Sequence, residues 1–122
     1  MLQNLSWINI ADNSGVKEAM IIRVLGGSNQ KTANVGDIVV CSAKTVIPSS
    51  TIKKGQVIKA VIVRSKFGVK RIDGTCVKFD DNAAVIIKED KTPRATRVFG
   101  ALAREVKDSG FSKIASLAEE IV

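Results

Sequence analysis

A chain of 122 residues has room for one packed domain and not for two. Its 19 Lys and Arg residues outnumber its 12 Asp and Glu residues, so the formal net charge is +7, which favours an anionic partner. With 45% hydrophobic residues the chain can bury a core without a disulfide or a metal, and no apolar run reaches the length of a membrane span.

Short runs rich in Val and Ile recur up to about residue 90, separated by Gly, Asn and Asp. This pattern predicts six strands, at Ser6–Ile10, Glu18–Leu25, Asp37–Val46, Gln56–Arg64, Thr75–Phe79 and Ala83–Ile87. The pair Asp73-Gly74 is the strongest candidate for a hairpin turn. Since closure removes exposed sheet edges, we expect a small, closed or nearly closed β-barrel.

The pattern changes after Pro93, where apolar residues recur three and four positions apart. This spacing predicts two short helices, over Ala101–Lys107 and Phe111–Ala118, with Gly110 ending the first. Such short helices are marginal alone and should pack against the barrel. We therefore expect one domain over 1–122, with a barrel over about 1–90 and a C-terminal helical lobe over about 91–122.

The two cysteines, Cys41 and Cys76, lie in apolar or alternating runs and are expected to be small buried hydrophobes. Two unclustered cysteines fit a reducing, cytosol-like compartment, although the interior of an organelle remains open. The first ten residues lack the basic and small-residue features of a signal peptide, so neither secretion nor membrane insertion is expected.

The excess positive charge is concentrated in the middle of the chain. Residues 53–104 carry thirteen basic and five acidic side chains, whereas 1–52 carry four and three, and 105–122 carry two and four. The basic residues alternate with β-branched ones, so they must lie on a folded surface. The stretch from Lys53-Lys54-Gly55 to Arg71 is interpreted as a basic hairpin with a glycine turn at Gly68, in which Arg64 and Arg71 could contact phosphates through two nitrogens. A solvated face of an ordinary basic protein is the alternative.

Catalytic chemistry has little support. The chain has no histidine, and its cysteines form no CxxC pair, so a zinc site, a metal or another cofactor is not expected. Asp80-Asp81, followed by Asn82, fits a turn better than an acid–base pair, and Gly26-Gly27-Ser28 lacks the spacing of a phosphate-binding loop. We expect a protein that is not an enzyme.

The aromatic content bears on the kind of nucleic acid. With four Phe, one Trp and no Tyr, and only Phe67 inside the basic stretch, a base-stacking surface has little support. Structured RNA, contacted through phosphates and 2′-hydroxyls, therefore ranks above single strands, and duplex DNA remains open.

Several motifs, in order, resemble those of the large ribosomal subunit protein fourteen family in its bacterial and organellar branch. They are Asn9–Gly15, Arg23–Ser28, Val35–Ile38, Lys53–Gly55, Lys59–Arg64, Asp73-Gly74, Phe79–Ile86, Thr96-Arg97 and Phe99-Gly100. The resemblance covers essentially the whole chain. It departs from the family pattern at Ala95, Ala101 and Glu119 in the C-terminal lobe, and at Ser49-Ser50, where the family has a more basic or glycine-rich ribbon tip.

The resemblance implies a mainly β fold: a five-stranded β-barrel with a projecting β-ribbon and a short C-terminal helical lobe. It also implies a structural constituent of the large ribosomal subunit, located in cytoplasmic ribosomes or in those of an organelle. The implied partners are large-subunit rRNA, small-subunit rRNA at an intersubunit bridge, a neighbouring large-subunit protein and a ribosomal silencing factor, with no membrane contact.

Two sets of site residues follow from these arguments. The residues expected to bind RNA are Lys44, Lys53, Lys54, Lys59, Arg64, Lys66, Lys70 and Arg71. By resemblance, Thr96, Arg97 and Lys113 are expected to bind a protein partner. A free-standing barrel that regulates RNA or DNA, and a small hydrolase that uses Asp80 or Asp81, are the competing hypotheses.

Overall fold

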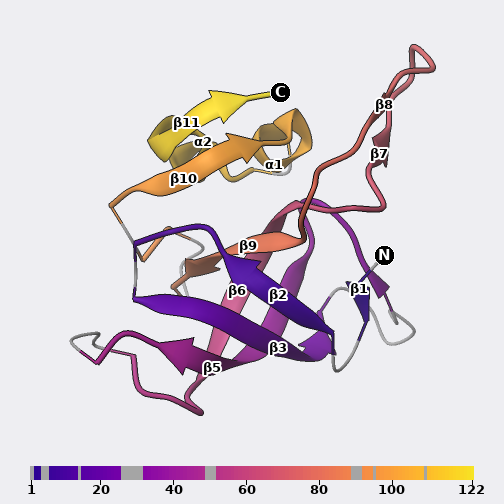
Figure 1. Ribbon diagram of the computed structural model, residues 1–122. Helices are drawn as coiled ribbons and strands as arrows, with labels where there is room; N and C mark the ends of the chain where they lie inside the picture. The colour runs from indigo at the N-terminus through magenta and orange to yellow at the C-terminus, as the bar shows by residue number, and fades with distance from the viewer. Residues whose placement is uncertain are drawn as a thin grey trace.

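The structure is a computed structural model that describes residues 2–3, 6–13, 15–25, 32–48, 52–88, 92–94, 96–108 and 110–122. Strands dominate it, and two short helices lie near the C-terminus (Figure 1). In chain order the elements are β1 Leu2–Gln3, β2 Trp7–Ile10, β3 Val16–Val24, β4 Thr32–Ala33, β5 Ile38–Val46, β6 Val57–Arg64, β7 Val69–Lys70, β8 Cys76–Val77, β9 Ala83–Ile87, β10 Val98–Leu102, α1 Arg104–Asp108, α2 Ser112–Leu117 and β11 Ala118–Ile121.

Five strands form a closed barrel in the order β2-β3-β5-β6-β9, which confirms the predicted fold class. Neighbours pair antiparallel except at the closure, where β9 runs parallel to β2 with Asn9 opposite Ala83. Closure leaves none of the five strands as an open edge. The predicted strand Thr75–Phe79 is not part of the barrel, because only Cys76–Val77 is a strand and it pairs with β7.

The strands β6 and β9 are buried on both faces. Ala60 and Ile62 of β6 point into the barrel, whereas Val61 and Val63 face a second apolar cluster outside it. In β9, all five residues are buried. Burial on both faces explains why these strands read as nearly continuous apolar runs and not as alternating ones.

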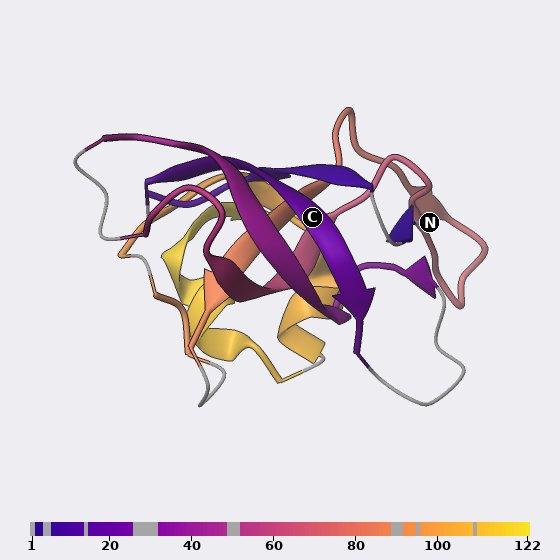
Figure 2. The same ribbon diagram turned by 90° about the horizontal axis from the view of Figure 1, so that it is seen from below.

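The second cluster lies between the barrel and a C-terminal lobe made of β10, α1, α2 and β11. In this lobe, β10 and β11 pair in parallel, and both helices lie in the connection between them. Figure 1 shows the lobe, in orange and yellow, above the barrel, and Figure 2 shows the purple barrel strands crossing in front of it. The buried lobe side chains are Val98, Leu102, Val106, Phe111 and Ile114, packed with Val61, Val63 and Val85 of the barrel.

The two helices are confirmed, but they are shorter than the sequence predicted. Residues 101 and 102 belong to β10, α1 begins at Arg104, and Ala118 begins β11. The spacing of Ala101, Leu102 and Ala103 fits a strand as well as a helix over so few residues. Residues 101 and 102 are strand because Leu102 pairs with Ile121 of β11.

A narrow ribbon, β7–β8, projects from the barrel beyond the end of β6 (Figure 1). Its turn is at Asp73-Gly74, as predicted: Gly74 has a φ of 89°, and the Gly74 N–H donates to the Arg71 carbonyl at 3.0 Å. Gly68 is not the turn of a hairpin. A Cβ there would lie 2.6 Å from the Val77 carbonyl oxygen, so glycine allows the two ribbon strands to approach. Ser49-Ser50, expected at a ribbon tip, lies outside the described residues.

The two cysteines differ in burial. Cys41 points into the barrel, and this burial raises the pKa of its thiol to about 12. Cys76 is exposed on the ribbon, so the prediction that it is buried is wrong. A two-residue strand has little apolar cover, and sequence alternation alone did not reveal that β8 lies outside the barrel.

Candidate nucleic-acid interface

The predicted cations lie at both ends of β6. At its first end, Lys53 and Lys54 are exposed in the connection from β5. Two hydrogen bonds stabilise this turn. The Lys53 N–H donates to the Gln56 side-chain oxygen at 3.1 Å, and the Gln56 N–H donates to the Lys53 carbonyl oxygen at 3.0 Å. The turn therefore holds two ammonium groups out in solvent.

Two further predicted lysines lie within the barrel strands. Lys59 is half-buried in β6, opposite Ile87 of β9, and Lys44 is half-buried in β5. Their apolar stems cover barrel surface and leave their ammonium groups near solvent.

At the other end of β6, Lys66 and Lys70 are exposed at the base of the ribbon. The backbone there is fixed, since the Lys66 N–H donates to the Asn82 side-chain oxygen at 2.8 Å. Asp80, Asp81 and Asn82 directly precede β9, in the connection where the sequence predicted a turn. Among the residues that the structure describes, no group of three His, Cys, Asp or Glu is positioned to hold a metal.

Arg64 is used within the protein. Its side chain is only 14% exposed, and its Nε lies 3.2 Å from the Asp81 carboxylate. Its Nη1 donates to the carbonyl oxygens of Phe99, at 3.1 Å, and Ala101, at 3.4 Å. The guanidinium therefore joins β6 to β10, and its planar set of donors suits it to several acceptors at once.

Arg71 is also held internally. Its Nε donates to the Glu105 carboxylate at 3.0 Å, and its Nη2 donates to the Val122 carbonyl at 2.6 Å. These bonds connect the base of the ribbon to α1 and to the residue that follows β11. Arg64 and Arg71 thus offer few free donors for a phosphate, unlike the exposed lysines beside them.

Two of the predicted partner-binding residues, Thr96 and Arg97, directly precede β10, whereas the third, Lys113, lies in α2. The Asn13 side-chain oxygen accepts the backbone N–H groups of Thr96 and Arg97, at 3.1 and 3.2 Å. The Arg97 guanidinium lies 5.4 Å from the centre of the Phe99 ring, and Phe99 is 44% exposed. Lys113 is exposed in the first turn of α2. Ala95 lies outside the described residues.

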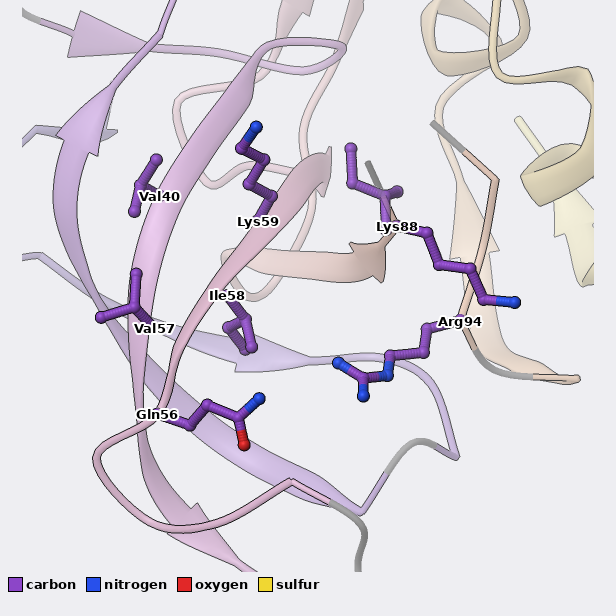
Figure 3. Close-up of a pocket in the computed structure, with 8 residues that line it drawn as sticks. Val40, Gln56, Val57, Ile58, Lys59, Lys88 and Arg94 are labelled. Atoms are coloured by element: carbon purple, nitrogen blue, oxygen red, sulfur yellow. The ribbon is translucent and has the colours of Figure 1, made fainter. Parts of the chain in front are cut away.

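Sequence reasoning missed a group of residues at the first end of β6. Lys88 and Arg94 are exposed there and line a groove together with Gln56 and Lys59 (Figure 3). Lys88 directly follows a buried strand, and this position in the sequence could have identified it as a candidate binding residue. Its proximity to Lys59, however, depends on the register of β6 against β9.

Asp81 and Glu105 are paired internally with Arg64 and Arg71, whereas Lys53, Lys54, Lys66 and Lys70 are exposed. A closed barrel with this charge distribution is typical of a small structural protein that contacts an extended anionic partner. Of the helices that the structure describes, neither has the length and hydrophobicity to cross a membrane.

Comparison with known proteins identifies the family. The sequence model described as ribosomal protein L14p/L23e matches residues 1–122. Proteins named large ribosomal subunit protein uL14 from Mesomycoplasma hyopneumoniae strains 7448, J and 232 are each 61% identical over 122 residues, covering all of both chains. The chain belongs to this ribosomal protein family, whose members are structural and not enzymatic. This confirms the resemblance and the expectation of a non-enzyme.

Proposed function

We propose that this protein, a structural constituent of the large ribosomal subunit, binds the rRNA of that subunit through exposed cations at both ends of β6. The observation that supports this is the separation of roles among charges: Asp81 and Glu105 are paired with Arg64 and Arg71, so the exposed lysines beside them are not neutralised locally. Surfaces of this kind bind phosphates with a strong dependence on salt.

The two basic surfaces are separated by the length of β6. Eight residues at about 3.3 Å each place them roughly 25 Å apart. Lys53 and Lys54 belong to the first surface, and Lys66 and Lys70 to the second. Such a separation suits contact with two backbone segments of a folded RNA better than with one short strand.

Incorporation into ribosomes tests the assignment. The double variant Lys53→Glu with Lys54→Glu is expected to enter large subunits and whole ribosomes less well than the unmodified protein. Sucrose-gradient sedimentation with mass spectrometry of the fractions measures this incorporation. The control, Lys17→Glu with Arg23→Glu, changes two exposed cations of β3 by the same total charge. If the unmodified protein stays wholly at the top of the gradient, the proposal is wrong; a free RNA regulator would behave in this way.

A third group of residues, Thr96, Arg97 and Lys113, is proposed to contact small-subunit rRNA and neighbouring proteins, including a silencing factor. Its support is the exposed Phe99 ring beneath the Arg97 guanidinium, since aromatic and arginine side chains are enriched in protein interfaces. Large subunits that carry Arg97→Ala should join small subunits more weakly in light scattering. Unchanged joining and unchanged silencing would contradict this role.

A further inference from the structure

A groove of about 400 Å³ lies at the end of the barrel opposite the ribbon. Its lining comes from β5, from the start of β6 and from the segment around the end of β9, and comprises Val40, Gln56, Val57, Ile58, Lys59, Ile87, Lys88 and Arg94. Neither the internal arginines nor the proposed partner-binding residues line it. A cavity of this size falls within the range of sites that hold a small molecule or one residue of a polymer.

The backbone builds this groove by turning back after β9. Ile87 forms an isolated bridge with Pro93, and the Arg94 N–H donates to the Ile86 carbonyl at 3.1 Å. The Lys88 N–H donates to the Thr92 carbonyl at 2.9 Å. These bonds place Arg94, seven residues beyond Ile87 in sequence, beside the same strand end. The backbone position of Arg94 is therefore set by its pairing with the end of β9.

The side chains offer three kinds of contact. Figure 3 shows the Arg94 guanidinium and the Gln56 carboxamide pointing toward one another, with Ile58 above Gln56 in this view. Lys59 and Lys88 also line the groove, but their ammonium groups point away from the space between Gln56 and Arg94 (Figure 3); no acidic residue is among the described residues that line the groove. Val57 adds apolar surface, being 61% exposed. Lys88 and Arg94 are themselves exposed, and no hydrogen bond or ion pair of their side chains occurs within the described ranges.

We propose that this groove binds one unpaired ribonucleotide of an RNA strand. Arg94 contacts a phosphate, while the base lies against Ile58 with one edge toward the Gln56 carboxamide. Guanidinium planes and side-chain amides are standard partners of splayed-out bases. This inference rests on the proposed RNA binding and adds to it the class of RNA feature that is recognised.

A paired helix fits the groove poorly. Its phosphates follow a convex backbone, which needs cations on a convex or flat surface, such as the lysines at the base of the ribbon. A concave site gains contact area with RNA only if a base leaves the stack and enters it. The chain thus combines a surface for paired backbone at one end of β6 with a pocket for an unpaired nucleotide at the other.

The test compares RNA hairpins that differ only in one bulged nucleotide. Fluorescence anisotropy would measure the affinity of the intact protein for a fully paired hairpin and for four hairpins that carry a bulged A, C, G or U. At least one bulged hairpin should bind about tenfold more tightly than the paired one. The variant Arg94→Gln with Gln56→Ala should abolish this difference in affinity. The variant Lys66→Gln with Lys70→Gln should lower the affinity for all five RNAs by the same factor.

The outcomes separate this inference from the proposed function. Equal, measurable affinity for all five hairpins overturns the nucleotide site and leaves RNA binding in place. Absence of binding to any hairpin overturns both. If AMP alone binds as tightly as the best bulged hairpin, the groove is a site for free nucleotides and the assignment to an RNA strand is wrong.

Discussion

The two ends of β6 use positive charge in different ways. At the ribbon end, Arg64 and Arg71 are mostly buried and are bonded to carboxylates and carbonyls of the protein. At the other end the arginine, Arg94, is exposed, whereas the lysines are exposed at both ends: Lys53 and Lys54 at one, Lys66 and Lys70 at the other. A basic stretch in a sequence therefore contains both structural and available cations.

The geometry of the side chains explains part of this difference. A guanidinium has five donors in one plane and can link several acceptors, as Arg64 links Asp81 with two carbonyls of β10. A lysine ammonium is strongly hydrated and gains less from such a site. Arginines in the middle of this chain thus hold the lobe and the ribbon, and the lysines beside them remain in solvent.

Removing Arg64 should have the largest effect on folding. Arg64→Met removes the guanidinium that pairs with the Asp81 carboxylate and with two β10 carbonyls, and should lower the free energy of unfolding by about 3 kcal/mol. Urea denaturation measures this change. Arg94→Met, which alters an exposed arginine, should change stability by less than about 0.5 kcal/mol. Equal effects of the two substitutions would contradict the contrast between the ends.

The substitution Gly100→Ala tests whether the Arg64 side chain packs against β10. Gly100 has a φ of 78°, and a Cβ there would collide with the Arg64 guanidinium. The expected cost is about 2 kcal/mol in urea denaturation. In an Arg64→Met background the collision is relieved and only the cost of the left-handed backbone remains, so the effect should fall to about 1 kcal/mol. An unchanged cost in that background would show that Arg64 does not occupy this space.

The thiols report on the two ends separately, because Cys41 pairs in register with Ile58 near the groove, whereas Cys76 lies on the ribbon. Burial raises the pKa of Cys41 from 9.0 to about 12, so above pH 9 the unfolded chain loses this proton first and stability falls as pH rises. The expected slope is at most about 1.4 kcal/mol per pH unit. Urea denaturation at pH 8, 9 and 10 measures it. Cys41→Ala should reduce the slope, and Cys76→Ala should not.

Neutralising the lysines of the ribbon end should have the smallest effect on folding. Lys66→Gln with Lys70→Gln removes two exposed charges and should change stability by less than about 0.5 kcal/mol. The same variant should reduce the slope of log affinity against log salt by about 2 for a paired RNA, because two phosphate contacts are lost. A loss of stability with an unchanged salt slope would show that these lysines are structural, like Arg64.

Much of the barrel could be predicted from the sequence, and much of the site could not. β9 has the predicted bounds, Ala83–Ile87, because a short apolar run between polar turns has few other solutions. By contrast, the internal roles of Arg64 and Arg71 depend on Phe99, Glu105 and other residues more than thirty positions away. The groove likewise exists only because Arg94 returns to the end of β9.

The position of β9 has a consequence for synthesis of the chain. The barrel closes when β9 inserts between β2 and β6, yet β9 is the last of its five strands to be made. Until then β2 and β6 are the two edges of an open sheet whose backbone groups are unpaired. A chain interrupted before residue 83 would keep these edges and could pair with another such chain. Newly made copies are therefore most prone to aggregation during the interval between completion of β6 and completion of β9.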